Sequence, residues 1–162
     1  MKQKKKYKII FLDIDGVLNV MSQEFDDYGQ LYNPIFVDNL AYIIEKTNAK
    51  LVISSFWRYR GIKHMRELWK HRNLPGEIIG ITPDFINDDD SVRGNEIKSW
   101  LEKNIDIVET YCIIDDDEDM LSEQLNNFVK TSGNSDHPDC DDIGYGLTRI
   151  CSEKVIEILN NK

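Results

Sequence analysis

The chain has 162 residues, of which 41% are hydrophobic, and its formal net charge is −9. This length allows one domain with a hydrophobic core, covering residues 1–162, and excludes a second catalytic domain. The negative charge repels phosphate backbones, so contact with a nucleic acid requires a local basic patch. Lysines crowd residues 1–7, which we expect to form a basic, flexible tail.

The cysteine content predicts a reducing compartment. The three cysteines are an odd number and have no Cys-x-x-Cys spacing, which is not typical of a disulfide framework. The apolar stretch after the N-terminal lysines is short and is interrupted by Asp13, and no other run approaches the length of a membrane-spanning helix. We therefore expect a cytoplasmic protein that has no membrane partner.

Short apolar runs alternate along the chain with longer segments of helical spacing. The runs predict strands at residues 8–12, 50–53, 77–81, 111–114 and 127–130. The helical segments cover residues 36–45, 62–71 and 95–102, and a last helix follows Thr148 as its N-cap. We expect the last helix to bury Ile150, Val155, Ile158 and Leu159. Alternating strands and helices are typical of an α/β fold with a central parallel sheet, which predicts a three-layer, Rossmann-like architecture.

Three segments lack this periodicity. Residues 84–91 are acidic and residues 132–146 are rich in Gly, Ser, Asp and Asn, so we expect both to be mobile surface loops. Residues 19–33 lie between the first strand and the first helix and are too few for a folded lid domain. They predict a short flap, and therefore a minimal cap over the ends of the strands.

Two carboxylates follow the first predicted strand. Asp13 and Asp15 are two positions apart, so in an extended segment they point to the same face and place like charges close together. Unless a cation or a shared proton offsets the repulsion, one carboxylate must lose its charge. The pair therefore favours a metal site. The alternative is an ordinary turn at Asp15-Gly16, since Asp-Gly is a common turn dipeptide.

Other predicted strands also end in polar residues. Ser54 and Ser55 follow the second strand, and Asp115 and Asp116 follow the strand at residues 111–114. In an open parallel sheet, ligands bind outside the carboxyl ends of the strands. The convergence of these polar ends on one crevice favours a ligand site over a turn.

At these strand ends the sequence resembles the haloacid dehalogenase-like (HAD) superfamily, whose four motifs occur in the same order. The matching segments are FLDIDGVLN, LVISS, VRGNEI and CIIDDDEDM, within residues 9–119. The segments SSFWR, RGNEIKSWL and GLT further resemble a narrower group, the small HAD domains associated with Swiss Army Knife RNA repair proteins. The resemblance implies a HAD phosphatase fold.

The resemblance also implies a mechanism. Asp13 would be the nucleophile that attacks phosphorus and forms an aspartyl-phosphate, and Asp15 would be the general acid and base. Mg²⁺ would be held by Asp13, by the backbone carbonyl of Asp15, and by Asp115 or Asp116. Asp119 is a further candidate acid, because the superfamily sometimes uses one at this distance.

The remaining implied roles concern the phosphoryl group. Ser54 would bind a phosphoryl oxygen, and Arg93 would stabilise its negative charge. The superfamily usually has Lys at the position of Arg93, so Lys98, one helical turn later, stays an alternative. The further candidates for substrate binding are Gly16, Ser55 and Arg58. Arg58 is expected either to bind a second substrate phosphate or to lie on the surface.

These features lead to one main hypothesis and three alternatives. The first is a Mg²⁺-dependent phosphatase acting on a nucleic-acid end such as a 3′-phosphate, where exposed aromatic residues could stack on a base. The aromatic candidates are Phe25, Tyr28, Tyr32, Trp57 and Tyr59, for which packing is the alternative. The other functions are a phosphatase of nucleotides or other small metabolites, a non-catalytic domain that binds a metal or a partner, and a dehalogenase, which Asp15 disfavours. No P-loop occurs in the sequence, so any kinase or ligase partner would be a separate protein.

Overall fold

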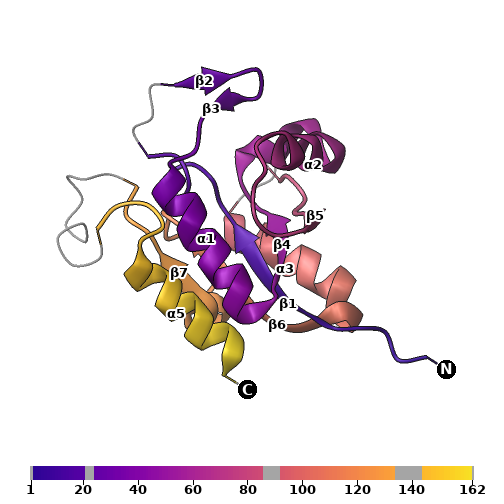
Figure 1. The fold of residues 1–162 in the computed structure, drawn as a ribbon. Coiled ribbons are helices and arrows are strands. Elements are labelled where there is room, and N and C mark those ends of the chain that lie inside the picture. The colour runs from indigo at the N-terminus through magenta and orange to yellow at the C-terminus, as the bar shows by residue number, and fades with distance from the viewer. Residues whose placement is uncertain (1, 21–23, 86–91, 134–143, 162) are drawn as a thin grey trace.

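Five parallel strands form the central sheet of the computed structural model, which describes residues 2–20, 24–85, 92–133 and 144–161. The strands lie in the order β5-β4-β1-β6-β7 (Figure 1). Their bounds are β1 (Tyr7–Leu12), β4 (Lys50–Ile53), β5 (Ile78–Ile81), β6 (Val108–Asp115) and β7 (Phe128–Lys130). All five predicted strands are present: β4 has the predicted bounds, the other four differ at one or both ends by one to three residues, and β1 begins inside the expected tail.

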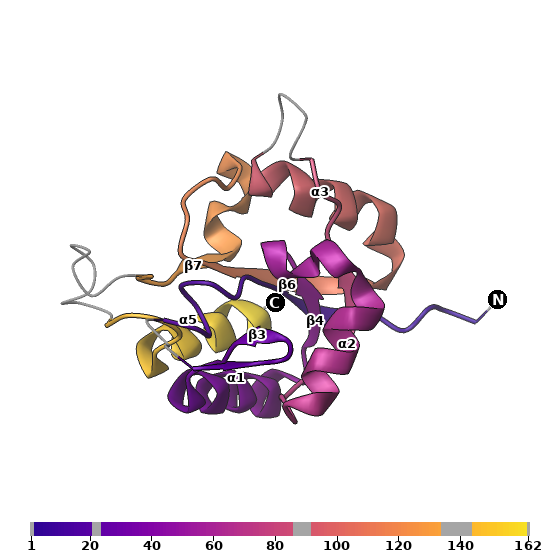
Figure 2. The ribbon, with the colours of Figure 1, turned by 90° about the horizontal axis from the view of Figure 1, so that it is seen from above.

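Helices cover both faces of the sheet. They are α1 (Pro34–Thr47), α2 (Ile62–His71), α3 (Arg93–Asn104) and α5 (Arg149–Asn160). Seen from above, α3 lies on one side of the sheet and α1 and α5 on the other (Figure 2). The three-layer, Rossmann-like α/β fold predicted from the sequence is therefore confirmed.

The alternation of side chains along β1 explains why both faces are covered. Ile10 and Leu12 belong to a large core cluster with residues of α1, α2 and α5. Ile9 and Phe11 point to the opposite face and pack in a smaller cluster with residues of α3. A strand that is buried on both faces reads as a continuous apolar run, which is the pattern in the sequence.

The helix termini depend on local capping. The Asn33 side chain accepts a hydrogen bond from the Ile35 backbone N–H, and Pro34 takes the first position of α1, so the helix begins two residues before the predicted start. Thr148 caps α5 as predicted. The predicted burial of Ile150 is wrong, because this side chain is 51% exposed and Cys151 is buried in the core instead.

The flap and the loops differ from the other segments. Within residues 19–33 the structure describes an antiparallel hairpin of β2 (Phe25–Asp26) and β3 (Gly29–Gln30). Of the two expected loops, residues 86–91 and 134–143 lie outside the described residues. None of the helices in the described part of the chain is long and apolar enough to cross a membrane.

Candidate active site

The carboxyl ends of three neighbouring strands build the site. Backbone hydrogen bonds continue one residue beyond the strands: the Asp13 N–H donates to the Ile114 carbonyl (3.0 Å) and the Ser54 N–H to the Leu12 carbonyl (3.1 Å). Asp115 is the last residue of β6, the neighbour of β1 on its other side. The sheet itself therefore positions Asp13, Ser54 and Asp115 at one edge.

Three carboxylates meet at this edge. Oxygen atoms of Asp13, Asp115 and Asp116 all lie within 4.8 Å of one another, with Asp13 and Asp115 buried and Asp116 half-buried. Burial and the charge of Asp13 raise the pKa of both Asp115 and Asp116 above the usual range of a carboxyl group. Carboxylate oxygens are the ligands that a hard cation such as Mg²⁺ prefers. The cluster therefore fits the predicted metal, and it contains three of the predicted ligands.

Arg93 is the cation that bonds to this acidic cluster. Its Nη1 lies 2.9 Å from Asp13 Oδ1 and 2.8 Å from Asp115 Oδ2. Burial lowers the pKa of Arg93, but the neighbouring carboxylates outweigh this effect and raise it above the ordinary value. The exposed Lys98 instead pairs with Glu123 at 3.4 Å. Of the two candidate cations, the structure thus brings Arg93 to the site.

The charge balance of the cluster supports a bound cation. One guanidinium faces three carboxylates, which leaves excess negative charge where two of the carboxylates are buried. Like charges in such a place are expensive unless bound protons or a cation offset them, and a hard cation such as Mg²⁺ would do so with all three carboxylates ionised.

Asp119 has a structural position at the start of α3. Its Oδ2 accepts a hydrogen bond from the Arg93 backbone N–H (2.9 Å), and its carbonyl accepts one from the Gly94 N–H (3.1 Å). A carboxylate at this place satisfies a helix N–H and interacts favourably with the helix dipole. Asp119 therefore positions Arg93 and is not part of the acidic cluster.

Gly16 makes room for Asp116. A Cβ built on Gly16 would lie 2.2 Å from Asp116 Oδ2, and φ of Gly16 is +79°, so a side chain is excluded on both counts. The Gly16 N–H donates to the Asn19 carbonyl at 3.3 Å within the turn, and its carbonyl accepts a hydrogen bond from Thr131. Gly16 therefore has a spacing role beside Asp116, and its binding of substrate stays a prediction.

The Asp15 carboxylate lies outside the acidic cluster and is exposed. Its Oδ1 accepts two hydrogen bonds, from Asn19 Nδ2 at 2.7 Å and from Trp57 Nε1 at 3.0 Å. The sequence pattern did not reveal Trp57 as a partner, because it is 42 residues from Asp15 and the bond depends on the tertiary fold, whereas Asn19 is only four residues away.

The two serines after β4 have different environments. Ser54 is completely buried, and its Oγ has no hydrogen-bond partner among the described residues. Ser55 Oγ accepts the Trp57 backbone N–H at 3.3 Å and caps the 3-10 helix η1 (Phe56–Arg60). Ser54 thus has a hydroxyl available for a ligand, whereas Ser55 Oγ already accepts one hydrogen bond in the cap, and substrate binding by Ser55 stays a prediction.

Arg58 stabilises the frame behind the site. Its guanidinium donates to Glu96 Oε2 at 2.9 Å and to four backbone carbonyls, those of Ser54, Ser55, Thr82 and Pro83. These bonds occupy the five donors of the group, and the side chain is 4% exposed. Burial lowers the pKa of Arg58, and the Glu96 charge opposes this. Neither predicted role of Arg58, on the surface or on a substrate phosphate, agrees with this position.

The aromatic candidates divide by exposure. Trp57 and Tyr32 pack edge to face at 5.4 Å, whereas Phe25 and Tyr59 are exposed. The sequence reasoning missed Phe56, which is 57% exposed and whose ring centroid lies 5.8 Å from the Arg93 guanidinium carbon. The clue to Phe56 in the sequence was its position directly after Ser54 and Ser55. Phe56 is therefore an exposed aromatic side chain next to the acidic site.

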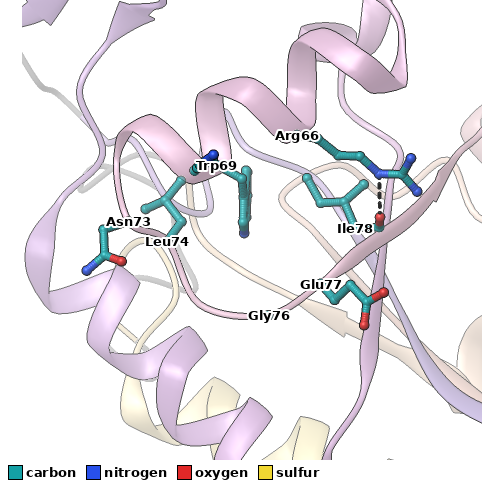
Figure 3. A pocket seen from close by; sticks show the side chains of 8 residues that line it. Arg66, Trp69, Asn73, Leu74, Gly76, Glu77 and Ile78 are labelled. Carbon is teal, nitrogen blue, oxygen red and sulfur yellow. Dashed lines mark hydrogen bonds between the residues drawn. The ribbon is translucent and has the colours of Figure 1, made fainter.

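A separate hollow lies between α2 and β5 (Figure 3). It has a volume of about 340 Å³ and is lined by residues that include Trp69 and Ile78, where Arg66 Nε donates to the Ile78 carbonyl at 2.9 Å. None of its lining residues belongs to the acidic cluster, so it is a different place from the candidate active site.

The parallel sheet, the acidic strand ends and the arginine at the start of α3 together define a HAD-like domain. The sequence model of one family, described as the HAD domain in Swiss Army Knife RNA repair proteins, matches residues 9–135. The chain belongs to this family, and the resemblance found in its motifs is confirmed. Searches of curated proteins and of solved structures gave no match.

Proposed function

We propose that the protein is a Mg²⁺-dependent phosphomonoester hydrolase that acts on a phosphorylated nucleic-acid end, most simply a 3′-phosphate. The observation that carries the proposal is the buried Asp13, which lies beside two further carboxylates and bonds to Arg93. The unpartnered Ser54 hydroxyl on the neighbouring strand supports it, because a phosphoryl oxygen would satisfy this donor.

The reaction would follow two steps on the same carboxylate. A carboxylate oxygen of Asp13 attacks phosphorus, the bond from phosphorus to the ester oxygen breaks, and Asp15 gives that oxygen a proton. Asp15 then takes a proton from the water that attacks the aspartyl-phosphate, which releases inorganic phosphate and restores Asp13. Arg93 and Ser54 stabilise the negative oxygens of the transferring group.

The same residues would hold the cation. Asp13, Asp115 and Asp116 supply the carboxylate oxygens, and the backbone carbonyl of Asp15 is the further ligand that the family resemblance implies. Bound Mg²⁺ supplies positive charge that offsets the repulsion between carboxylates and phosphate.

Two observations support a nucleic-acid end as substrate. The matched family is named for RNA repair proteins, and the exposed Phe56 lies next to Arg93, where a terminal base or sugar could stack on it. The net charge of −9 disfavours tight binding of a long polyanion, so we infer recognition of an end rather than of a tract. The same charge favours the second candidate function, hydrolysis of nucleotides or other small phosphorylated metabolites.

The setting of this activity is also part of the proposal. We place it in the cytoplasm, in a single domain, with kinase or ligase activities on separate partner proteins. A domain that only binds a metal or a partner would not need the nucleophile, so the presence of both Asp13 and Asp15 disfavours that alternative.

The first test measures phosphate release from a 3′-phosphorylated oligonucleotide, a 5′-phosphorylated oligonucleotide and a mononucleotide, each with Mg²⁺ and with EDTA. We expect Mg²⁺-dependent release, fastest from the 3′-phosphate, that disappears in Asp13→Asn. The control is Asp117→Asn, which removes an exposed neighbouring carboxylate outside the acidic cluster and should retain activity.

Each other outcome has a definite meaning. Faster phosphate release from the mononucleotide would show that the substrate is a small metabolite rather than a nucleic-acid end. If a folded, Mg²⁺-loaded protein releases no phosphate from any of the substrates, the hydrolase proposal fails and the binding domain is favoured.

A further inference from the structure

The β2–β3 hairpin is clamped to the end of α2. Arg72, the residue after α2, donates to both carboxylate oxygens of Asp26 at 2.9 and 2.7 Å and to the carbonyls of Gly29 and Gln30 at 3.1 Å. The hydrogen bond from Arg72 lowers the pKa of Asp26 to about 2. A paired arginine and carboxylate with two parallel bonds fixes orientation as well as distance. The hairpin, which lies apart from the main sheet in Figure 1, is therefore tied to the body of the domain.

The clamped hairpin holds the ring of Trp57. A Cβ at Gly29 would be 3.2 Å from this ring, and Tyr32 packs against it edge to face with ring centroids 5.4 Å apart. The Arg72 guanidinium lies 4.6 Å from the centroid of Tyr32 and 5.7 Å from that of Trp57. The indole is thus surrounded by one hairpin residue, one aromatic ring and one cation, which leaves it little freedom to rotate.

From this position Trp57 reaches Asp15. The indole Nε1 donates to Asp15 Oδ1 at 3.0 Å, and Asn19 Nδ2 donates to the same oxygen at 2.7 Å. Asn19 also donates to Gln30 Oε1 of the hairpin at 3.2 Å. Among the described residues, no hydrogen bond is made to Asp15 Oδ2. Both donors therefore hold one oxygen of the carboxylate and leave the other available.

We propose that Trp57, supported by the Arg72-clamped hairpin, is a positioning residue that holds Asp15 with Oδ2 available to the substrate. The proposal rests on the hydrolase function above and deepens it. When the bond from phosphorus to the ester oxygen breaks, the proton on Oδ2 passes to the leaving oxygen, and the carboxylate that remains takes a proton from the water of the second step. Oδ1 stays bonded to the two N–H donors throughout.

The test compares leaving groups. A 3′-phosphorylated oligonucleotide has an alcohol leaving group that needs a proton, whereas p-nitrophenyl phosphate has a leaving group stable as an anion. Trp57→Phe keeps an aromatic ring but removes the N–H, so kcat/KM for the oligonucleotide should fall by about 10- to 100-fold, as for partial loss of general acid catalysis. For p-nitrophenyl phosphate we expect kcat/KM to change by less than about 3-fold, because p-nitrophenolate leaves without being protonated. Arg72→Lys loosens the clamp and should also lower kcat/KM for the oligonucleotide, by a smaller factor than Trp57→Phe.

Trp69→Phe is the matched control. Trp69 is buried, whereas Trp57 is half-buried, but it likewise makes an indole hydrogen bond, from Nε1 to the Pro75 carbonyl at 2.9 Å, and it lines the hollow of Figure 3. This variant loses the same chemical group and should leave the ratio of the two kcat/KM values unchanged.

A second readout does not depend on activity. In ¹H–¹⁵N spectra, Asp15→Asn should shift the indole signal of Trp57 and leave that of Trp69 in place, because only the first indole donates to Asp15. An unshifted Trp57 signal would overturn the proposal, as would equal loss on both substrates in Trp57→Phe or no loss on either. If the wild-type protein is inactive on both substrates, the hydrolase function fails together with the positioning role. If the wild type is active and Trp57→Phe loses activity equally on both substrates, only the positioning role fails.

Discussion

Ser54 carries a buried hydroxyl that the protein itself does not satisfy. The side chain is completely buried, and its Oγ has no partner among the described residues. A buried polar group without a hydrogen bond costs about 1–3 kcal/mol. Such a cost is typical of functional sites, where a ligand satisfies the group.

This residue gives a prediction in which stability and activity change in opposite directions. Ser54→Ala removes the unsatisfied hydroxyl and should raise the free energy of unfolding by about 1 kcal/mol. The same change should lower kcat by about 100-fold, because one donor to the transferring phosphoryl group is lost. Urea denaturation and phosphate release measure the two effects.

Ser55→Ala is the matched control for this pair of measurements. Its hydroxyl caps η1, so the change should lower the free energy of unfolding by about 1 kcal/mol. If Ser54→Ala also destabilises the protein and keeps full activity, the hydroxyl has a structural partner and no role in the reaction.

At the scale of the elements, one ion pair joins the strand ends to α3. Arg58 of η1 bonds to the carbonyls of Ser54 and Thr82, which follow β4 and β5, and to Glu96 of α3. Both side chains of the pair are buried. Removing one partner of such a pair leaves an uncompensated buried charge, which is far more costly than removal of an exposed pair.

We therefore predict that Arg58→Leu lowers the free energy of unfolding by about 3–5 kcal/mol. Arg60→Leu on the same 3-10 helix is the control, and since Arg60 is exposed it should change stability by less than about 0.5 kcal/mol. Urea denaturation of both variants measures the difference. A stable Arg58→Leu variant with a raised KM for a doubly phosphorylated substrate would instead restore the substrate role expected from the sequence.

At the scale of the whole molecule, folding brings three carboxylates of the acidic cluster into one place. Burial and the charge of Asp13 raise the pKa of Asp115 and Asp116, so above about pH 4 the folded protein binds more protons than the unfolded chain. Their contribution to stability is therefore complete below the unfolded pKa and is lost as the pH rises through the folded pKa. A cation that binds the folded state reverses this loss.

This linkage predicts how Mg²⁺ and pH act together. In EDTA, Asp116→Asn should be more stable than the wild type, because the variant lacks one of the carboxyl groups whose pKa is raised in the folded state. The difference in stability should grow as the pH rises above about 4. Saturation with Mg²⁺, at about 100 times its Kd, should add about 2.7 kcal/mol to the wild type and less to the variant. Thermal unfolding at matched ionic strength measures both effects. Equal responses of the two proteins to Mg²⁺ would contradict a metal site at Asp116.

The amino-acid sequence by itself determined the class of fold and the residues at the ends of the strands. Each strand of the central sheet contains a short apolar run, and β4 and α2 have the predicted bounds, because burial on both faces and helical spacing are visible locally. Asp13, Ser54 and Asp115 were predictable as neighbours, since the carboxyl ends of parallel strands meet at one edge.

Only the tertiary structure decided which polar side chains contact the site. Arg58 and Arg93 were both candidates for binding phosphate, yet Arg58 donates to backbone carbonyls and to Glu96, whereas Arg93 reaches Asp13. One of the two donors to Asp15 is Trp57, which follows another strand, β4. Sequence patterns report whether a residue is buried, whereas the direction of a long side chain depends on packing between elements that are distant in the chain.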